Sequence, residues 1–424
     1  MLVFVDKITP RVRYIFDLLL NDLVGTPFHF AKSKEEFIQS KEEKLSYAVS
    51  KICDEVFVQR TADLLYEIGV IKQQNITLNS QDKDFDMFSA AFMCVSRYEE
   101  YLPFDSDIHK RYPASSSSAF KQGLLHLPLV NLWAKALKAR LIAAYPHLVF
   151  RNRQYNFINT IDVDSVFAFK GKGLALSLAG LCRDVLVRRN AAMMLTRIKI
   201  LLDIEEDIAN NFDFITKVAE DNKAKTMFFM QVGRYGRFDK NINIKNRDFQ
   251  TIIRRLATQY KIGIHPSYAS DSKKTIIEKE IKNLQNVIPH QPIADSRFHF
   301  IRFSLPKSYN VLTELGITDD YSMGYTDKVG FRASICTPYH FYDLQRETQT
   351  PLVVHPYAIM DVTLQQYYSQ TPLQTIKTMI DAVKAVDGEF ISVFHNQNMS
   401  ETDEWKGWKS IYKQTIEYAN RLSQ

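Results

Sequence analysis

The chain has 424 residues, of which 46% are hydrophobic, 12% aromatic and 24% charged, as in a protein that is globular throughout. Its formal charge of +6 comes from 54 basic and 48 acidic residues, which permits an acidic partner without requiring one, and we expect no nucleic-acid partner. The four cysteines are far apart and form no Cys-x-x-Cys pair, which argues against a zinc knuckle and a dense disulfide framework.

The N-terminal sequence MLVFVDKITPRVRYIF lacks the basic start, the apolar run and the small-residue cleavage site of a secretory signal. No stretch approaches 18 uninterrupted apolar residues, so we expect no transmembrane segment and a cytoplasmic protein. A chain of this length predicts two domains, which we place at residues 1–150 and 151–424.

The first unit, residues 1–150, is predicted to be a smaller α+β domain whose role is unknown. Apolar spacing predicts helices at 10–23, 86–100 and 129–144, and the segment 28–51 is typical of short strands and hairpins. A loop rich in Ser, Pro and charge spans 102–123. We expect an ordinary surface loop there, with a lid over a functional site as the alternative.

The second unit, residues 151–424, alternates strand-like and helical stretches, with predicted helices at 248–260 and 272–287. Seven strands interleaved with helices predict a closed or nearly closed (β/α) barrel, and a doubly wound open sheet is the alternative. An insertion at 174–215, basic in its first half and acidic in its second, predicts two solvated helices or a basic surface for a membrane or an anionic substrate. The strands are predicted at 155–164, 226–232, 261–265, 298–303, 321–325, 352–355 and 390–395.

Ionisable residues gather at the ends of these predicted strands. Asp162 and Asp164 end the first strand, His265 and His395 end two others, and His299 lies near the end of a fourth. Side chains at the carboxyl ends of barrel strands line the active site. Two histidines and one aspartate with an open coordination position form the ligand set of a hydrolytic metal site.

Several separated motifs resemble the polysaccharide deacetylases with a NodB-homology domain, in carbohydrate esterase family 4. The closest resemblance is to a bacterial branch, common in Bacteroidetes, in which such a domain follows an uncharacterised N-terminal domain. The resemblance covers 151–424, and SRYEEYLPF (96–104) extends it into the first unit. The other stretches that carry it are TIDVD (160–164), IHPSY (264–268), SRFHFIRFSLP (296–306), LGITDDYSMGY (315–325), GFRAS (330–334), CTPYHFYDL (336–344) and FISVFHN (390–396).

The resemblance implies a distorted (β/α)7 barrel and metal-assisted hydrolysis of an N-acetyl or O-acetyl group on a sugar. Asp162 matches the general base, which deprotonates the attacking water, and His395 matches the general acid, which protonates the leaving group. Asp164 matches a metal ligand, and Arg332 in GFRAS resembles the arginine that holds the base.

His265 matches the first histidine of the family's HxxxH motif and is therefore a second implied metal ligand. The second histidine of that motif falls at Ala269, which cannot bind metal, and His299 is our candidate replacement because its strand should neighbour that of His265. The implied metal is a divalent ion, most simply Zn²⁺. Pro338 and Tyr339 resemble the wall of the family's acetate pocket. Tyr268 and Tyr325 lie in the same motifs, where their rings suit the apolar face of a sugar, and packing in the core explains them equally well.

Three interpretations of the function follow. The first is a deacetylase that acts on an acetylated sugar or glycan intermediate. The second, which Ala269 favours, is a degenerate NodB-like domain that binds glycan in envelope polysaccharide biosynthesis without hydrolysing it. The third is a structural or assembly protein whose first unit contacts envelope-biosynthesis enzymes.

Overall fold

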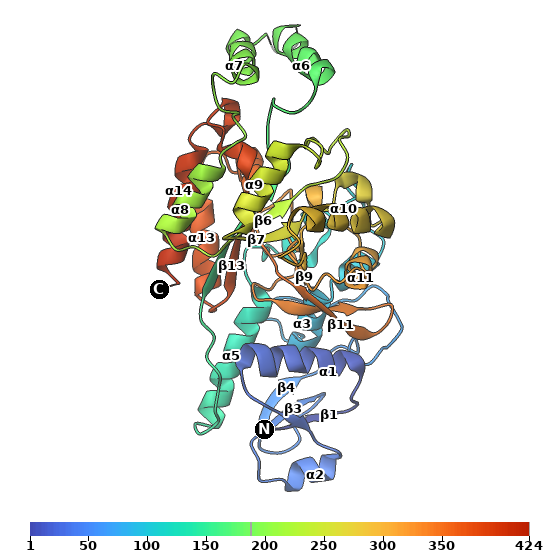
Figure 1. The fold of residues 1–424 in the computed structure, drawn as a ribbon. Coiled ribbons are helices and arrows are strands. Elements are labelled where there is room, and N and C mark those ends of the chain that lie inside the picture. Colours follow the sequence, from blue (N-terminus) through green and yellow to red (C-terminus); the bar gives the residue numbers. More distant parts are fainter. Residues whose placement is uncertain (187–188, 424) are drawn as a thin grey trace.

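Two β-sheets organise the computed structural model, which describes residues 1–186 and 189–423 (Figure 1). The main hydrophobic core extends from Val3 in the first sheet to Ala419 in the last helix, and a small separate cluster consists of Phe169, Met193 and Ile200. The two predicted units are therefore packed against each other through buried apolar side chains, and the burial of this surface is the main force that holds them together.

The first sheet has the strand order β2-β1-β3-β4, and each neighbouring pair is parallel. The hairpins predicted for 28–51 are therefore wrong. A short helix, α2, lies between β2 and β3 where a hairpin would need a tight turn, and it allows these strands to run in the same direction. It begins where the Ser33 side chain accepts a hydrogen bond from the Glu36 N–H. The strands are β1 (Leu2–Val5), β2 (His29–Phe30), β3 (Lys44–Ala48) and β4 (Val56–Gln59).

The helices predicted in the first unit are present. The predicted helix at 10–23 is α1 followed by a π-helical segment over Asp17–Val24, and the predicted helix at 129–144 coincides with α5. Almost all of α3 is buried, and it is followed by a 3₁₀ turn at Tyr98–Tyr101. The helices are α1 (Pro10–Phe16), α2 (Lys34–Gln39), α3 (Met87–Val95), α4 (Ser118–Lys121) and α5 (Leu129–Ala144).

The second sheet has nine strands within the described residues, in the order β10-β11-β9-β8-β7-β6-β5-β13-β12. All neighbours are parallel except the β10–β11 pair, so most carboxyl ends meet at one edge. The strands are β5 (Asn156–Val163), β6 (Thr226–Met230), β7 (Lys261–Ile264), β8 (Asp295–Ser296), β9 (Asp319–Asp320), β10 (Tyr339–Asp343), β11 (Thr348–Val354), β12 (Ile359–Met360) and β13 (Glu389–His395).

Two predicted strands are displaced. The strand predicted at 298–303 is β8 at 295–296, because Phe300 and Ile301 adopt positive φ angles of 60° and 52°, which an extended strand excludes. The strand predicted at 321–325 is β9 at 319–320. It ends because Asp320 turns the chain by accepting hydrogen bonds from the backbone and side chain of Ser322.

The second sheet is strongly curled. When the register is followed from strand to strand across the sheet, from β11 to β5, Val354 of β11 corresponds to Val163 near the end of β5. The next residue, His355, lies 3.0 Å from Glu389, which is level with Asn156 at the other end of β5. Such a stagger is typical of a sheet that rolls toward closure. No strand pairing among the described residues joins the end strands β10 and β12, so the closed barrel stays a prediction.

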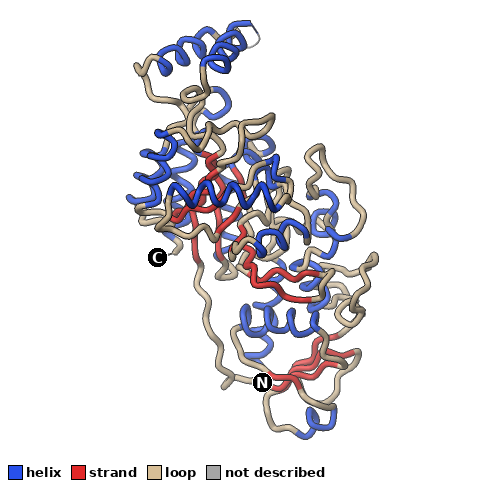
Figure 2. Tube along the Cα trace, turned by 45° about the vertical axis from the view of Figure 1, so that its right-hand side comes forward, coloured by secondary structure: helices blue, strands red, loops and turns tan. Residues whose placement is uncertain are grey.

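Helices surround this sheet, and two of them stand away from it (Figures 1 and 2). The predicted insertion forms α6 and α7, which are joined by an ion pair between Arg197 and Asp184 at 2.7 Å. Arg188 of its predicted basic half lies outside the described residues. The helices of this unit are α6 (Leu174–Leu186), α7 (Ala191–Leu201), α8 (Phe212–Asp221), α9 (Arg247–Ala257), α10 (Lys274–Val287), α11 (Lys307–Glu314), α12 (Asp361–Tyr367), α13 (Pro372–Lys384) and α14 (Trp408–Arg421).

None of the helices in the described part of the chain combines the length and the apolar character that crossing a membrane requires.

Candidate metal centre

Three strands of the second sheet deliver the candidate ligands to one place. Asp164 follows β5, His265 follows β7, and His299 lies in a 3₁₀ turn just after β8. These strands are parallel, and β7 and β8 are direct neighbours through the pair Ile264–Ser296. The prediction that the strand of His299 neighbours that of His265 is therefore confirmed.

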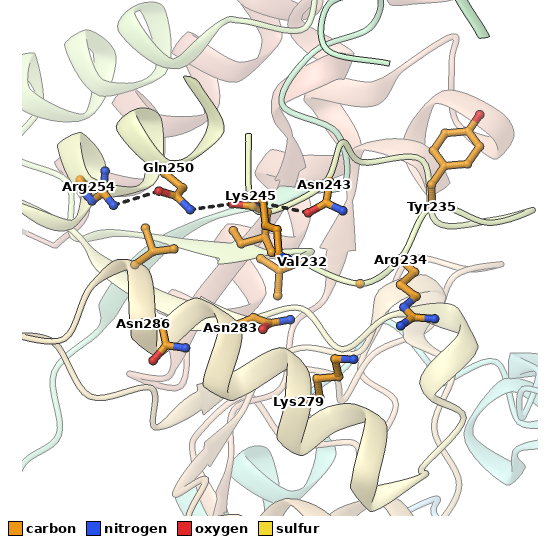
Figure 3. Close-up of a pocket in the computed structure, with 13 residues that line it drawn as sticks. Val232, Arg234, Tyr235, Asn243, Lys245, Gln250, Arg254, Lys279, Asn283 and Asn286 are labelled. Atoms are coloured by element: carbon orange, nitrogen blue, oxygen red, sulfur yellow. Dashed lines mark hydrogen bonds between the residues drawn. The ribbon is translucent and has the colours of Figure 1, made fainter. Parts of the chain in front are cut away.

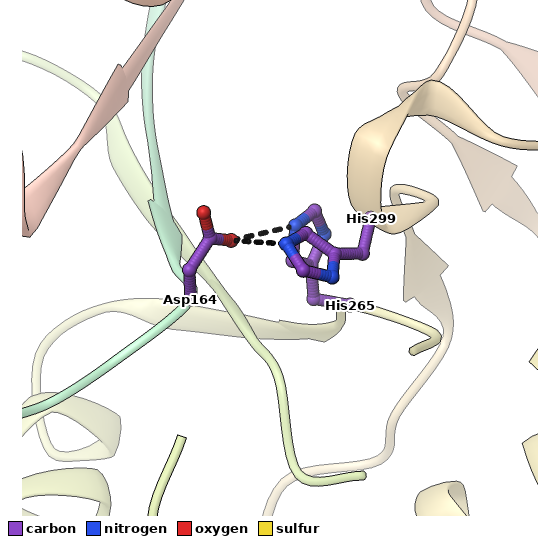
Figure 4. A group of neighbouring side chains, drawn as sticks. All are labelled: Asp164, His265 and His299. Atoms are coloured by element: carbon purple, nitrogen blue, oxygen red, sulfur yellow. Dashed lines mark ion pairs between the residues drawn. The ribbon is translucent and has the colours of Figure 1, made fainter. Parts of the chain in front are cut away.

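The three side chains face one another, as Figure 4 shows. Asp164 Oδ1 lies 3.2 Å from His265 Nε2 and 3.4 Å from His299 Nε2, and the ligand atoms of all three lie within 4.8 Å of one another. Asp164 Oδ1 and His265 Nε2 are buried without a hydrogen-bond partner in the described structure. Since burying such atoms unpaired is costly, a cation shared by the three side chains fits this group.

The electrostatics of the group also favour positive charge. Burial by itself raises the pKa of Asp164, but the neighbouring His299 and His395 outweigh it and hold that pKa well below its usual range. Burial lowers the pKa of His299, and the Asp164 and Asp239 carboxylates raise it, with a net value of about 9. A negative carboxylate opposite two imidazoles is the charge pattern that binds a divalent cation.

Hydrogen bonds behind the ligands fix the direction of both imidazoles. His265 donates through Nδ1 to the Arg297 carbonyl, and His299 donates through Nδ1 to Asp239 at 2.9 Å. Each ring therefore presents Nε2 to the centre. Asp239 in turn accepts hydrogen bonds from the backbone N–H groups of Tyr268 and Ala269, at 2.8 and 3.2 Å. Ala269, which stands where the resembling family has a ligand, thus supports the carboxylate that orients His299.

Asp162 is held by a different arginine from the one predicted. Arg297, fully buried, donates to Asp162 Oδ1 at 2.8 Å and to Thr160 Oγ1 at 2.7 Å. Asp162 Oδ2 lies 3.9 Å from His265 Nε2, so the base candidate borders the metal group.

Arg332, the predicted partner of the base, instead forms two hydrogen bonds with Glu100 of the first unit, at 2.9 and 2.6 Å. Arg97 also donates to Glu100, at 2.8 Å, so two buried arginines share one buried carboxylate. The prediction that Arg332 holds Asp162 is corrected. The reason is that burying Arg332 requires an opposite charge, and the first unit supplies it.

His395 lies beside the metal group and has its own carboxylate partner. Its Nδ1 lies 2.7 Å from Asp361 Oδ1, and its Nε2 lies 3.7 Å from Asp164 Oδ2. Burial lowers the pKa of His395, but Asp361 and then Asp164 raise it to about 10. Gln397 donates to Asp164 Oδ2 at 3.1 Å, so the turn after β13 contributes to holding the ligand.

Of the predicted substrate-binding residues, Tyr268 lies beside the metal group. Its ring packs with Phe238, Phe300 and His109, and its hydroxyl lies 3.2 Å from His109 Nδ1. His109 belongs to the loop 102–123 of the first unit, which therefore reaches the site.

The structure places the other three predicted substrate-binding residues elsewhere. Tyr325 and Tyr339 are 2% and 3% exposed and belong to the hydrophobic core, where Tyr325 lies under the Arg332 guanidinium. Pro338 is half-buried and precedes β10, the end strand of the sheet. A substrate contact for Tyr325 and Tyr339 is therefore corrected, because side chains that fill the core are not accessible to a ligand. The contact predicted for Pro338 stays a prediction.

Sequence reasoning missed Asp239, Arg297 and Asp361. Asp361 follows the two-residue strand β12, and the rule that found Asp164 applies to it equally. Arg297 lies directly after β8, within the motif SRFHFIRFSLP. Asp239 lies in an irregular segment between β6 and α9, where no periodic pattern points to it.

Three comparisons with known proteins place this geometry in context. A family of unknown function, DUF7033, matches residues 1–146. A crystal structure from Mycobacterium smegmatis, provisionally named a polysaccharide deacetylase, aligns with 12% identity and a TM-score of 0.38 over 62% of this chain and 83% of that one. No curated protein matches the chain. The functional assignment therefore depends on the residues of the chain itself.

Proposed function

We propose that this protein is a metal-dependent hydrolase that removes N- or O-acetyl groups from a carbohydrate. The observation that carries the proposal is the convergence of Asp164, His265 and His299, with two buried ligand atoms unpaired. Three protein ligands that leave a coordination position open are typical of hydrolytic rather than structural zinc sites.

Different residues around the metal group have different proposed roles in the hydrolysis. Asp164, His265 and His299 would hold a divalent ion, Zn²⁺ by the ligand set, which when bound would lower the pKa of a water and polarise the substrate carbonyl. Asp162, fixed by Arg297, is the proposed general base that takes the proton of the attacking water. His395, fixed by Asp361, is the proposed general acid that protonates the leaving amine or alcohol.

The proposed substrate is an acetylated sugar or glycan intermediate. Phe238, Tyr268 and Phe300 present an aromatic group beside His299, and aromatic rings pack against the apolar face of a sugar ring. In this proposal the curled sheet of residues 151–424 is a distorted NodB-like (β/α)7 barrel.

A second candidate is a glycan-binding protein that does not hydrolyse its ligand, because Ala269 stands where the family has a metal ligand. Asp162→Asn separates the two candidates. Under the hydrolase proposal this variant keeps its metal and loses acetate release at least about 100-fold, because general-base catalysis typically contributes a factor of this size or larger.

The test measures metal content and acetate release together. Purified wild-type protein is expected to hold about one divalent ion per chain and to release acetate from N-acetylglucosamine oligomers or O-acetylated sugars. His299→Ala is expected to lose both, and His290→Ala, which changes an exposed histidine, to lose neither. Metal-loaded wild-type protein without acetate release from any of these substrates, and with tight glycan binding, would establish the second candidate instead.

A further inference from the structure

A separate cavity of about 810 Å³ lies between α9, α10 and the segment that follows β6 (Figure 3). None of the candidate metal ligands lines it. Four cationic side chains do: Arg234, Lys245, Arg254 and Lys279. No aspartate or glutamate is among its lining residues.

Two of these cations, Arg254 on α9 and Lys279 on α10, differ from paired cations on the same helices. On α9, Arg255 pairs with Asp213 at 2.7 Å, and on α10, Lys282 pairs with Glu278 at 2.7 Å. Among the described residues, no carboxylate lies within 4 Å of the charged groups of the four cavity cations. The four cavity cations are therefore available to an anion.

The cavity is also partly organised in advance. Phe249 and Ile253 bury one face of α9, and Gln250 and Arg254 lie one turn apart on another. Gln250 donates to the Ile244 carbonyl at 3.0 Å and accepts from Arg254 Nη2 at 3.0 Å. One amide thus joins the helix to the preceding loop and restrains the guanidinium beside the cavity (Figure 3).

We propose that this cavity binds the diphosphate group of a small molecule such as a sugar nucleotide. Four cations suit the two to three negative charges of a diphosphate, and Arg and Lys form strong charge-assisted hydrogen bonds with phosphate oxygens. The volume lies in the range of small-molecule sites and exceeds what a single phosphate fills. Amide groups suit hydroxyl or base recognition, and the lining residues that carry them are Asn243, Gln250, Asn283 and Asn286.

The cavity adjoins the segment that carries one metal ligand. A second cavity, of about 340 Å³, shares Arg234 and Lys279 with it and is also lined by Ser267 and Ala269, just after His265. The diphosphate site is thus next to the candidate metal centre, although its own residues do not depend on a metal ion.

Titration calorimetry with inorganic pyrophosphate and with uridine diphosphate tests the proposal. Wild-type protein is expected to bind with a Kd that rises steeply with salt. Arg254→Gln combined with Lys279→Gln is expected to raise Kd at least about tenfold, since two charge-assisted contacts are lost. Lys282→Gln, which removes an outward charge from α10, is expected to change Kd less than about twofold. Tighter binding of uridine diphosphate than of pyrophosphate would show that the site recognises a nucleotide as well as its diphosphate. Equal binding of the two would show that the site recognises the diphosphate alone.

Asp164→Ala separates this site from the metal centre, because a diphosphate that bound the metal would lose affinity in that variant. Retained binding there supports the cavity, whether or not the protein is a deacetylase. A second double variant, Arg234→Gln with Lys245→Gln, must show the same rise in the Kd for diphosphate. Circular dichroism verifies that both double variants are folded. Equal Kd in wild type and both double variants would overturn the proposal, as would binding of a long sulfated polysaccharide in place of both diphosphates.

Discussion

At the scale of single residues, the site depends on partners that lie behind the ligands. The strand-end residues Asp164, His265 and His299 were predictable, because the carboxyl ends of parallel strands meet at one edge of a sheet. The hydrogen-bond partner of Arg332 was not predictable from the sequence. The choice between Asp162 and Glu100 depends on how the two units pack, and a motif in the sequence carries no information about that.

Asp239→Asn is predicted to weaken metal binding about 10- to 100-fold, because the carboxylate that orients His299 and increases its basicity is lost. Competition with a chromogenic chelator measures this affinity. Asp221→Asn, which changes an exposed carboxylate at the end of α8, serves as the control. An unchanged metal affinity in Asp239→Asn would show that His299 needs no such support.

At the scale of elements, the loop 102–123 of the first unit reaches the site instead of lying free on the surface. Arg111 donates to the Phe300 carbonyl at 2.9 Å and is held by Asp107 at 2.7 Å. Phe300 has a φ of 60° and directly follows His299. The loop therefore restrains the turn that carries a candidate ligand, and a backbone conformation with positive φ requires such support.

Arg111→Ala is predicted to reduce metal affinity several-fold while the protein stays folded, because the turn after β8 then samples other conformations. Chelator competition and a thermal melt measure the two effects separately. Arg346→Ala, at an exposed arginine near the chain reversal after β10, controls for the loss of one positive charge. Equal metal affinities in these two variants would remove the loop from the account of the site.

At the scale of the whole molecule, two charged groups join parts that are distant in the sequence. His355 bonds Asp319 at 2.8 Å and Glu389 at 3.0 Å, and so connects strands from opposite sides of the sheet order. Glu100 joins the two predicted units through Arg332, and Arg97 of its own unit also donates to it. The sequence predicted alternating strands and helices well, because local periodicity determines them. It could not predict these contacts, which depend on how the sheet curls.

His355 predicts a pH dependence of stability. Burial lowers its pKa, but the two carboxylates raise it to about 9, above the value of about 6.5 in an unfolded chain. The stabilisation, at most about 3 kcal/mol, is therefore fully present below about pH 6.5 and is lost as the pH rises through about 9. Urea unfolding of wild type and His355→Gln across this range measures it. A stability difference that stays constant from pH 6.5 to 9.5 would contradict the assignment.

Glu100→Gln is predicted to destabilise the protein by about 3–5 kcal/mol, because it leaves two buried arginines without a countercharge. Urea unfolding at neutral pH measures the loss. Glu404→Gln, at an exposed glutamate, is expected to stay within about 0.5 kcal/mol of wild type. A loss below about 1 kcal/mol in Glu100→Gln would mean that the interface between the units does not need this carboxylate.

The zinc K-edge absorption spectrum of the zinc-loaded protein tests the central claim most directly. The account predicts a first shell with two imidazole nitrogens and one carboxylate oxygen at roughly 2.0–2.2 Å, and the loss of one nitrogen in His299→Ala. A wild-type protein that binds no stoichiometric zinc, or a spectrum that is identical in His299→Ala, would contradict the assignment of Asp164, His265 and His299 as a metal centre.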